Sequence, residues 1–157
     1  MNYIDEYTKQ IADGTIGAGR WIKLLYDYIL KGLDTSQFFF SDEKANEVIE
    51  YIENNCYHTE GPLAPNLLKL SLWQKSDLSV MYGIVDGNGK RVFREVLFVM
   101  GRKNGKSLLA SAIAKYEWQK GGYGSRVFCI APKLDQTAII YDSIWTQTIL
   151  SPEYKEL

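Results

Sequence analysis

The chain has 157 residues, of which 46% are hydrophobic and 24% charged, values that are ordinary for one globular domain. A net charge of -1 excludes a general electrostatic attraction to nucleic acid, so any contact with DNA must come from a local patch. Cys56 and Cys129 are too far apart for metal-ligand spacing and predict two reduced thiols. The sequence shows no signal peptide and no apolar run of transmembrane length, so we expect a soluble intracellular protein.

The first part of the sequence predicts three helices in succession. They cover residues 3–12, residues 20–31, and a third stretch that follows the capping pattern at Ser41 and runs to about Asn54. The apolar positions expected to face the core in the second and third helices are Trp21, Leu24, Leu25, Tyr28 and Ile29, then Val48, Ile49 and Ile52. Gly61-Pro62 and Pro65 then interrupt the chain, so the sequence predicts a helical N-terminal segment over residues 1–60.

Residues 61–157 show a different order of elements. A fourth helix is expected near Ser71, and a turn at Asp86-Gly87-Asn88-Gly89 separates it from an apolar run over residues 97–100 that is typical of a buried parallel strand. Beyond a polar loop, the pattern continues with a helix that carries Leu109, Ala112, Ile113 and Tyr116 on one face, a second strand over residues 126–131, and a helix over residues 134–150. The order strand, helix, strand, helix predicts an α/β fold with a parallel sheet.

The polar loop reads Gly101-Arg-Lys-Asn-Gly-Lys-Ser107 and follows the pattern of a nucleotide-binding loop. The consensus G-x-x-x-x-G-K-[ST] would place its first glycine at Met100, so this loop is a variant that begins one residue later. Lys106 can reach the β- and γ-phosphates, the Ser107 hydroxyl can ligate Mg²⁺, and the N–H groups near Gly105 can face phosphate oxygens. The alternative is a polar helix N-terminus with Ser107 solvated. The strand before the loop and the helix after it favour a nucleoside triphosphate site.

Four motifs occur in a fixed order along the chain: Leu70-Ser-Leu-Trp73-Gln74, Phe93-Arg94, Arg102-Lys103-Asn104-Gly105-Lys106-Ser107 and Ala131-Pro-Lys-Leu-Asp135-Gln136. Their combination resembles the large subunit of tailed-phage terminases, the DNA-packaging motor. The stretches Asp13-Gly-Thr-Ile-Gly-Ala-Gly19 and His58-Thr59-Glu60-Gly61 also look like that family, so the resemblance spans nearly the whole chain. It implies a phosphate-loop NTPase fold with a parallel sheet, incomplete in this chain, over residues 61–157, with ATP and Mg²⁺ as its nucleotide and metal.

The resemblance also implies roles for individual residues. Gln74 would contact adenine, because a carboxamide can donate to one base atom and accept from another at once. Arg102 would stabilise charge on the γ-phosphate. Without the family, Gln74 is a solvated helix residue beside a core Trp73, and Arg102 is an exposed residue on a turn. The predicted catalytic residues are Arg102 and Lys106, the predicted metal ligand is Ser107, and the predicted nucleotide-binding residues are Gln74, Gly101, Arg102, Lys103, Asn104, Gly105, Lys106 and Ser107.

A phosphate-loop motor also needs an apolar strand that ends in Asp and then Glu, the Walker B region. No such strand follows residue 150, and the C-terminal nuclease domain of the family is absent as well. We therefore interpret the chain as the N-terminal fragment of a terminase large subunit, with the first part of the ATPase domain. It would bind ATP for the motor that translocates viral DNA into the prohead, and alone it would not hydrolyse ATP.

The full-length family implies an ATPase that is also a DNA endonuclease. Its implied partners are double-stranded phage DNA, the portal protein and the small terminase subunit, in a ring-forming homo-oligomer within the bacterial host cytoplasm, phage- or prophage-encoded and without a membrane. Two alternatives stay open. One is another phosphate-loop NTPase, such as a helicase-like enzyme. The other is a non-catalytic interaction module that has a vestigial loop.

Overall fold

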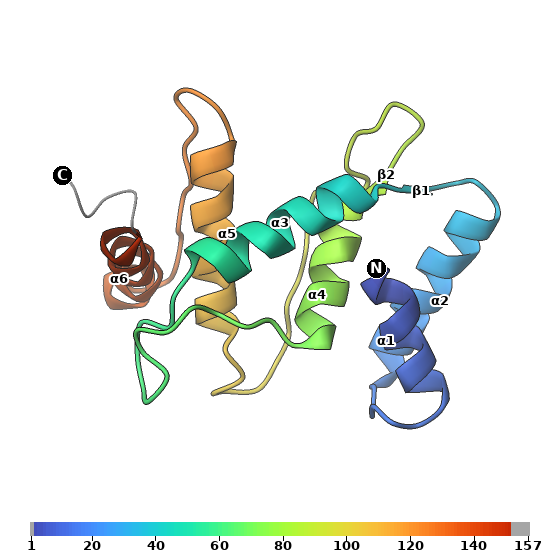
Figure 1. Ribbon diagram of the computed structural model, residues 1–157, viewed down its shortest axis with the longest axis horizontal. Helices are drawn as coiled ribbons and strands as arrows, with labels where there is room; N and C mark the ends of the chain where they lie inside the picture. The colour runs from blue at the N-terminus through green and yellow to red at the C-terminus, as the bar shows by residue number, and fades with distance from the viewer. Residues whose placement is uncertain (1, 152–157) are drawn as a thin grey trace. The chain divides into compact units, whose positions relative to one another are not determined.

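A computed structural model describes residues 2–151, which belong to two compact units. The first unit contains Met1–Ile49 and Leu70–Val96, and the second contains Glu50–Lys69 and Leu97–Leu157. Helix α3 (Asp42–Asn55) therefore contributes residues to both. Figure 1 shows the helices and strands with their labels. This division reflects which residues pack together. The predicted domain boundary at residue 61 stays a prediction.

The first unit consists of helices packed around one core and a short pair of strands. Besides the start of α3, its elements are α1 (Tyr3–Ala12), α2 (Arg20–Asp34), β1 (Phe39–Phe40), α4 (Leu72–Leu78), the π-helical turn η1 (Ser79–Gly83) and β2 (Ile84–Val85). Helix α1 begins after Asn2, whose side-chain oxygen accepts a hydrogen bond from the Ile4 backbone N–H at 3.0 Å. It packs against α2, α4 and η1. The core side chains are Ile4, Tyr7, Tyr26, Ile29, Phe38, Val80 and Ile84.

The helices of this unit lie where the sequence predicts them, but α2 buries a different face. The buried side chains of α2 include Tyr26 and Ile29, whereas Trp21 is 77% exposed and Tyr28 49% exposed. The prediction placed Trp21, Leu24 and Tyr28 in the core, and for these three it is wrong. The charged residues of α2, which are Arg20, Lys23, Asp27, Lys31 and Asp34, lie on one side of the helix, and apolar residues cover more than half of its circumference. This apolar surface is wider than the face that packing buries, so some of its residues stay exposed. Packing against α1 selects the buried face.

The only sheet within residues 2–151 is the antiparallel pair of β1 and β2. The sequence predicts parallel strands over residues 97–100 and 126–131, and neither segment is paired in the part of the chain that the structure describes. Their apolar side chains are open to solvent instead, with Leu97 86% exposed and Ile130 93% exposed. A parallel strand needs neighbours that take its backbone hydrogen bonds and cover its faces. The apolar pattern of a segment cannot supply those neighbours.

The second unit is built around two helices that pack against each other, α5 (Lys106–Lys120) and α6 (Leu134–Leu150). Helix α5 buries Leu109, Ala112 and Tyr116 as predicted, whereas Ile113 of the same predicted face is only partly buried. Tyr116 also meets Tyr51 of α3 edge-on, with ring centroids 5.2 Å apart. The bounds of α6 are those the sequence predicts. Among the described helices of the two units, none is both long enough and apolar enough to cross a membrane.

Candidate functional site

The predicted phosphate loop lies directly before α5 and turns the chain into that helix. Gly105 is the N-cap residue with a φ of +72°, a left-handed conformation that glycine adopts without strain. Lys103 also has a positive φ, +66°, which is uncommon for a residue with a Cβ. Left-handed residues at such a turn direct successive backbone N–H groups toward one point and form an anion-binding nest. Because no side chain caps α5, the N–H groups of its first turn can also face an anion.

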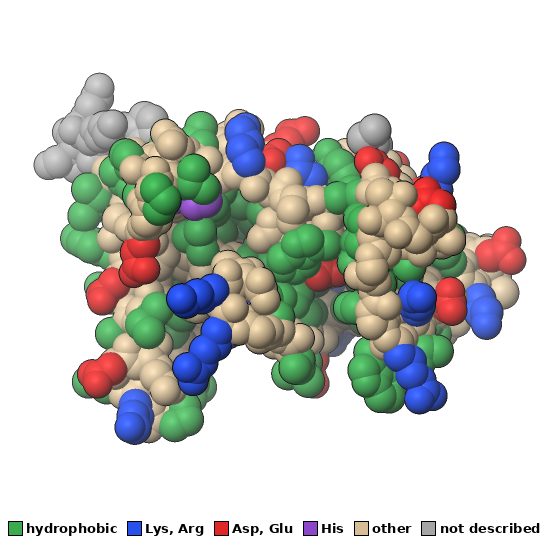
Figure 2. All heavy atoms as spheres, turned by 90° about the horizontal axis from the view of Figure 1, so that it is seen from below, with side chains coloured by type: hydrophobic (Ala, Val, Ile, Leu, Met, Phe, Trp, Pro, Cys, Tyr) green, Lys and Arg blue, Asp and Glu red, His purple; other side chains and the backbone are tan. Residues whose placement is uncertain are grey.

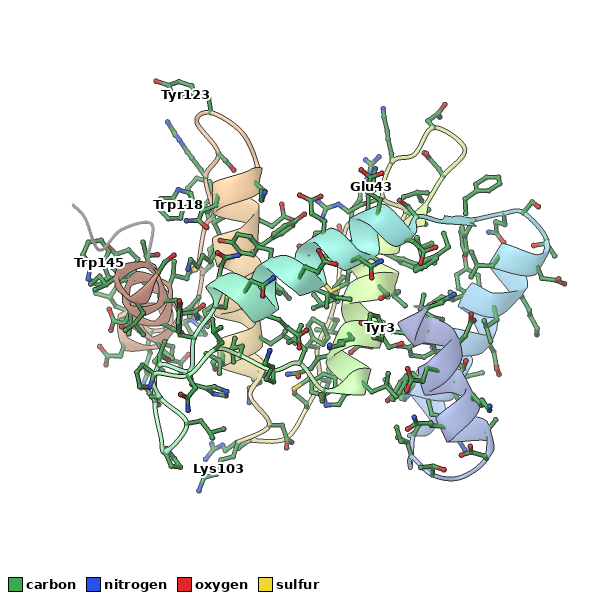
Figure 3. The ribbon with its side chains drawn as sticks, viewed as in Figure 1. Tyr3, Glu43, Lys103, Trp118, Tyr123 and Trp145 are labelled. Carbon is green, nitrogen blue, oxygen red and sulfur yellow. The ribbon has the colours of Figure 1, made fainter. Side chains whose placement is uncertain are left out.

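The loop brings seven predicted site residues together in an exposed, positively charged segment. They are Gly101, Arg102, Lys103, Asn104, Gly105, Lys106 and Ser107, and all are exposed. The side chain of Lys103 lies at the turn before α5 and points away from the helix (Figure 3). No Asp or Glu occurs from Met100 to Tyr116. A local field of this sign attracts polyphosphates and DNA alike, so charge by itself does not identify the ligand.

Buried polar contacts hold α5 in position behind the loop. Lys115 is fully buried, and its ammonium group donates to the backbone carbonyls of Asn55 at 2.7 Å and of Gln147 at 3.1 Å. Both carbonyls lie in the last turns of their helices, α3 and α6, where the helix dipole concentrates negative charge. Gln147 also donates from Nε2 to the Ser111 hydroxyl of α5 at 2.9 Å. These contacts fix the register of α5 against α6, and so they support the loop at the start of α5.

Gln74 belongs to the first unit, whereas the loop belongs to the second. Gln74 is the third residue of α4, and its Oε1 accepts hydrogen bonds from the Ser71 backbone N–H at 2.8 Å and from the Ser71 hydroxyl at 3.0 Å. Ser71 is the N-cap residue of α4, so the Gln74 side chain reaches back to the start of its own helix as in a capping box. The carboxamide that is predicted to contact adenine is therefore oriented by Ser71.

A buried hydrogen-bonded cluster follows Gln74 along α4. The Tyr26 hydroxyl donates to Ser76 Oγ at 2.7 Å and to Asp77 Oδ1 at 3.0 Å. Burial raises the pKa of the Asp77 carboxyl to about 6 from an ordinary value of 3.8, while the hydrogen bond from Tyr26 acts in the opposite direction. Burial and the Asp77 charge likewise raise the pKa of Tyr26. The cluster ties α4, which carries Gln74, to α2.

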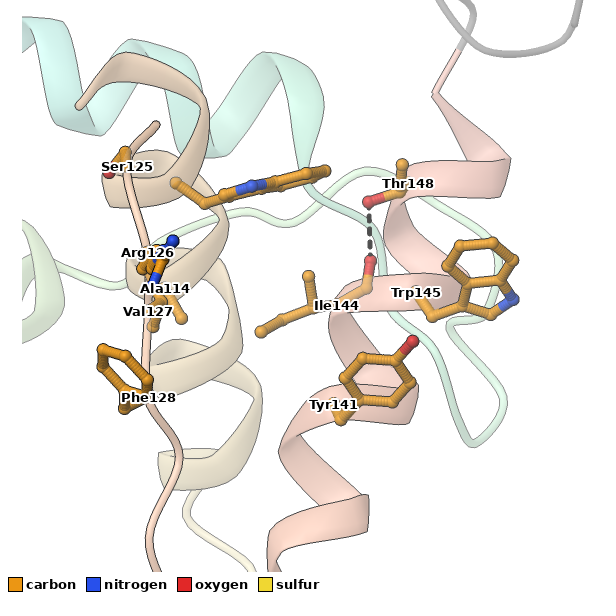
Figure 4. A pocket seen from close by; sticks show the side chains of 10 residues that line it. Ala114, Ser125, Arg126, Val127, Phe128, Tyr141, Ile144, Trp145 and Thr148 are labelled. Carbon is orange, nitrogen blue, oxygen red and sulfur yellow. Dashed lines mark hydrogen bonds between the residues drawn. The ribbon is translucent and has the colours of Figure 1, made fainter. Parts of the chain in front are cut away.

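The second unit also has an apolar groove of about 460 Å³ (Figure 4). Its lining residues come from the second half of α5, from residues 125–128 and from α6, and they are Ala114, Trp118, Ser125, Arg126, Val127, Phe128, Tyr141, Ile144, Trp145 and Thr148. None of the predicted nucleotide-binding residues lines it, so the groove is separate from the phosphate loop. Figure 2 shows that hydrophobic side chains reach the surface at several places on the face it displays.

Sequence reasoning missed three of these features, and only one of them left a signal. Ser71 and Gln74 have the S-x-x-Q spacing of a capping box, which the sequence does contain. Lys103 has a left-handed backbone conformation, and a glycine at that place would have indicated it, whereas a lysine does not. Lys115 has a spacing along α5 that does not distinguish a buried lysine from an exposed one, so no pattern could have revealed its burial.

Comparisons with known proteins agree on one family. The model of the family "Terminase large subunit, ATPase domain" matches residues 72–156, more than half of the chain. Curated relatives include the terminase large subunits of Lactococcus phage p2 and Lactococcus phage SK1, each 28% identical over 120 residues. Each alignment covers 72% of this chain and 22% of the relative, so the chain spans about a fifth of the length of these relatives. No solved structure matches the chain at a significant level.

Proposed function

Because the chain belongs to the family of terminase large subunit ATPase domains, we propose that it binds ATP through residues 101–107. The observation that supports this proposal most directly is the uncapped N-terminus of α5, preceded by a loop with left-handed residues at Lys103 and Gly105. In the proposal, the backbone N–H groups of this turn bind phosphate oxygens. The absence of carboxylates from Met100 to Tyr116 means that nothing in the segment repels a polyphosphate.

Three polar side chains of the loop have a proposed role. Lys106, the first residue of α5, extends its ammonium group to the β- and γ-phosphates. The Arg102 guanidinium stabilises the charge that develops on the γ-phosphoryl group. The exposed Ser107 hydroxyl is a hard oxygen ligand that fits Mg²⁺, which would neutralise phosphate charge. A single hydroxyl cannot complete the octahedral set of oxygen ligands that Mg²⁺ takes, so Ser107 would share the ion with the phosphates.

The proposal extends to the base and to the fold. Gln74 contacts the adenine, and its place at the start of α4 keeps the carboxamide in one orientation. Residues 97–100 and 126–131 act as strands of a parallel sheet in a phosphate-loop fold over residues 61–157, and residues 1–60 form the helical segment before it. The apolar side chains that both segments expose support this part of the proposal, because parallel strands carry apolar residues on both faces.

We place this nucleotide site in a larger motor. In the proposal, the chain supplies ATP binding to a terminase that translocates double-stranded phage DNA into the prohead in the bacterial host cytoplasm. The small terminase subunit and the portal protein are its partners, and the full-length protein forms a ring and carries the endonuclease. The curated relatives, named terminase large subunits and several times longer than this chain, support that placement.

Titration of the purified chain with a fluorescent ATP analogue tests the phosphate site. Lys106→Ala should weaken binding by at least about tenfold, because one charge-assisted hydrogen bond is worth about 1.5–3 kcal/mol. Lys23→Ala is the matched control, since it removes the same charge from an exposed position of α2. Equal affinities in the wild-type chain and in Lys106→Ala would overturn the assignment and favour an interaction module with a vestigial loop.

A second titration distinguishes the role of Arg102 from that of Lys106. If Arg102 acts on the γ-phosphate, Arg102→Ala should weaken the binding of ATP by about tenfold or more, while the binding of ADP changes little. A loss of equal size for ATP and ADP would contradict that role and would leave Arg102 as a general contributor to the local positive field.

A further inference from the structure

The bond between Ser71 and Gln74 determines which hydrogen-bonding groups Gln74 can offer to a base. Two donors, the backbone N–H and the hydroxyl of Ser71, point at the same side-chain atom of Gln74 at 2.8 Å and 3.0 Å. Since a backbone N–H can only donate, that atom must be the carbonyl oxygen Oε1 and not the amide nitrogen. The oxygen assignment of Gln74 is therefore fixed by chemistry.

A carbonyl oxygen has two lone pairs, and Ser71 occupies both of those on Gln74. The amide nitrogen Nε2 makes no hydrogen bond to any residue in the range 2–151 that the structure describes. As long as the Ser71 hydroxyl stays on Oε1, the Gln74 side chain presents N–H donors to a ligand and no acceptor.

The two purines respond differently to a group that can only donate. Adenine presents an acceptor at N7 and a donor at its 6-amino group, whereas guanine presents acceptors at both N7 and O6. A carboxamide distinguishes adenine by donating to N7 and accepting from the amino group at the same time. When Oε1 is occupied, the second of these bonds is lost, and the remaining donation to N7 is available in ATP and GTP alike.

We propose that the Ser71 hydroxyl sets the base selectivity of Gln74 by competing with the adenine 6-amino group for Oε1. This inference rests on the proposed role of Gln74 at the base. Ser71 acts through Gln74 and is a positioning residue. A backbone N–H is retained at position 71 in every Ser71 variant and can still donate to Oε1, so removal of the hydroxyl frees one lone pair without releasing the side chain.

The test compares the dissociation constants of ATP and GTP in four versions of the full chain. Ser71→Gly and Ser71→Ala remove the hydroxyl, and Ser71→Thr keeps it. The preference for ATP over GTP should rise by about 2- to 13-fold in the first two, the range of one neutral hydrogen bond, and should stay at the wild-type value in Ser71→Thr. Glycine is tolerated at an N-cap position almost as well as serine, so Ser71→Gly separates the effect on selectivity from any loss of helix stability.

Gln74→Ala supplies the background that shows whether the effect passes through the carboxamide. In that background Ser71→Gly should leave the ratio of ATP to GTP affinity unchanged, because no Oε1 remains to be freed. A change in thermal stability without a change in the ratio would reduce Ser71 to a helix cap and overturn the inference.

The titration of Lys106→Ala shows whether the inference about Ser71 or the proposed function itself has failed. If Lys106→Ala weakens nucleotide binding as proposed while Ser71→Gly leaves the ATP preference unaltered, only the inference about Ser71 is wrong. If Lys106→Ala has no effect, or if the wild-type chain binds neither nucleotide, the proposed function is wrong and the selectivity inference is overturned with it.

Discussion

The partly buried carboxyl of Asp77 should make the protein less stable at neutral pH than an amide would in the same place. The Tyr26 hydroxyl donates to Oδ1, and the oxygen of an asparagine can accept the same bond. Asp77→Asn therefore keeps the geometry of the cluster and removes only the charge. Removal of a buried charge that lacks full hydration is stabilising.

The magnitude and the sign of this change in stability follow from the raised pKa of Asp77. The difference between about 6 in the folded protein and 3.8 for an ordinary carboxyl corresponds to about 3 kcal/mol at a pH above both values. Because the folded state holds the proton more tightly than the unfolded state, this stability is present below about pH 4 and is lost as the pH rises through 6. We expect Asp77→Asn to gain up to about 3 kcal/mol at pH 8 and close to nothing at pH 4.

Urea denaturation at pH 4, 6 and 8 measures the effect. In a background with Trp118→Phe and Trp145→Phe, tryptophan fluorescence reports Trp21 and Trp73, which both belong to the first unit with Asp77. A signal from the first unit alone is needed because two compact units need not unfold in one step.

The control for this experiment is Asp27→Asn, which makes the same charge change at an exposed position of α2 and should give no comparable gain at pH 8. A destabilisation by Asp77→Asn that is equal at all three pH values would refute the reasoning. It would mean that the ionised carboxylate is fully compensated by its partners.

Three further predictions concern strain, close packing and turnover. Lys103→Gly should stabilise the chain by up to about 1 kcal/mol and Lys103→Val should destabilise it, because a left-handed φ suits glycine and opposes a β-branched residue; thermal melting in the reverse order would contradict the positive φ. Gly32→Ala should cost about 1–3 kcal/mol, since an added Cβ would lie 2.3 Å from Phe38 Cδ2, and an unchanged melting temperature would show that the Phe38 ring moves aside at no cost. The 157-residue chain should release no phosphate from ATP above background, because no apolar segment of its sequence after the loop ends in an acidic pair that could orient water; robust release that disappears in Lys106→Ala would reveal an unrecognised catalytic acid.

Local sequence determined where the helices begin and end and where the candidate phosphate loop lies. Helix α6 has its predicted bounds, and α5 begins at Lys106, within the glycine-rich motif. Such positions can be predicted because capping residues, glycine turns and helical periodicity act between residues that are close in the chain. Ser71 and Gln74 likewise have the sequence spacing of a capping box, which is the interaction that orients the proposed adenine contact.

The tertiary structure decided which of several apolar or polar faces became buried. Helix α2 turned Tyr26 inward and left Trp21 in solvent, and the ammonium group of Lys115 reached the ends of two other helices. These outcomes depend on groups that are far apart in sequence. Asn55 and Lys115, for example, are 60 positions apart, and no local pattern encodes their contact. The two segments predicted as parallel strands show the same limit, because a strand is stabilised by hydrogen bonds to a neighbour that its own residues do not specify.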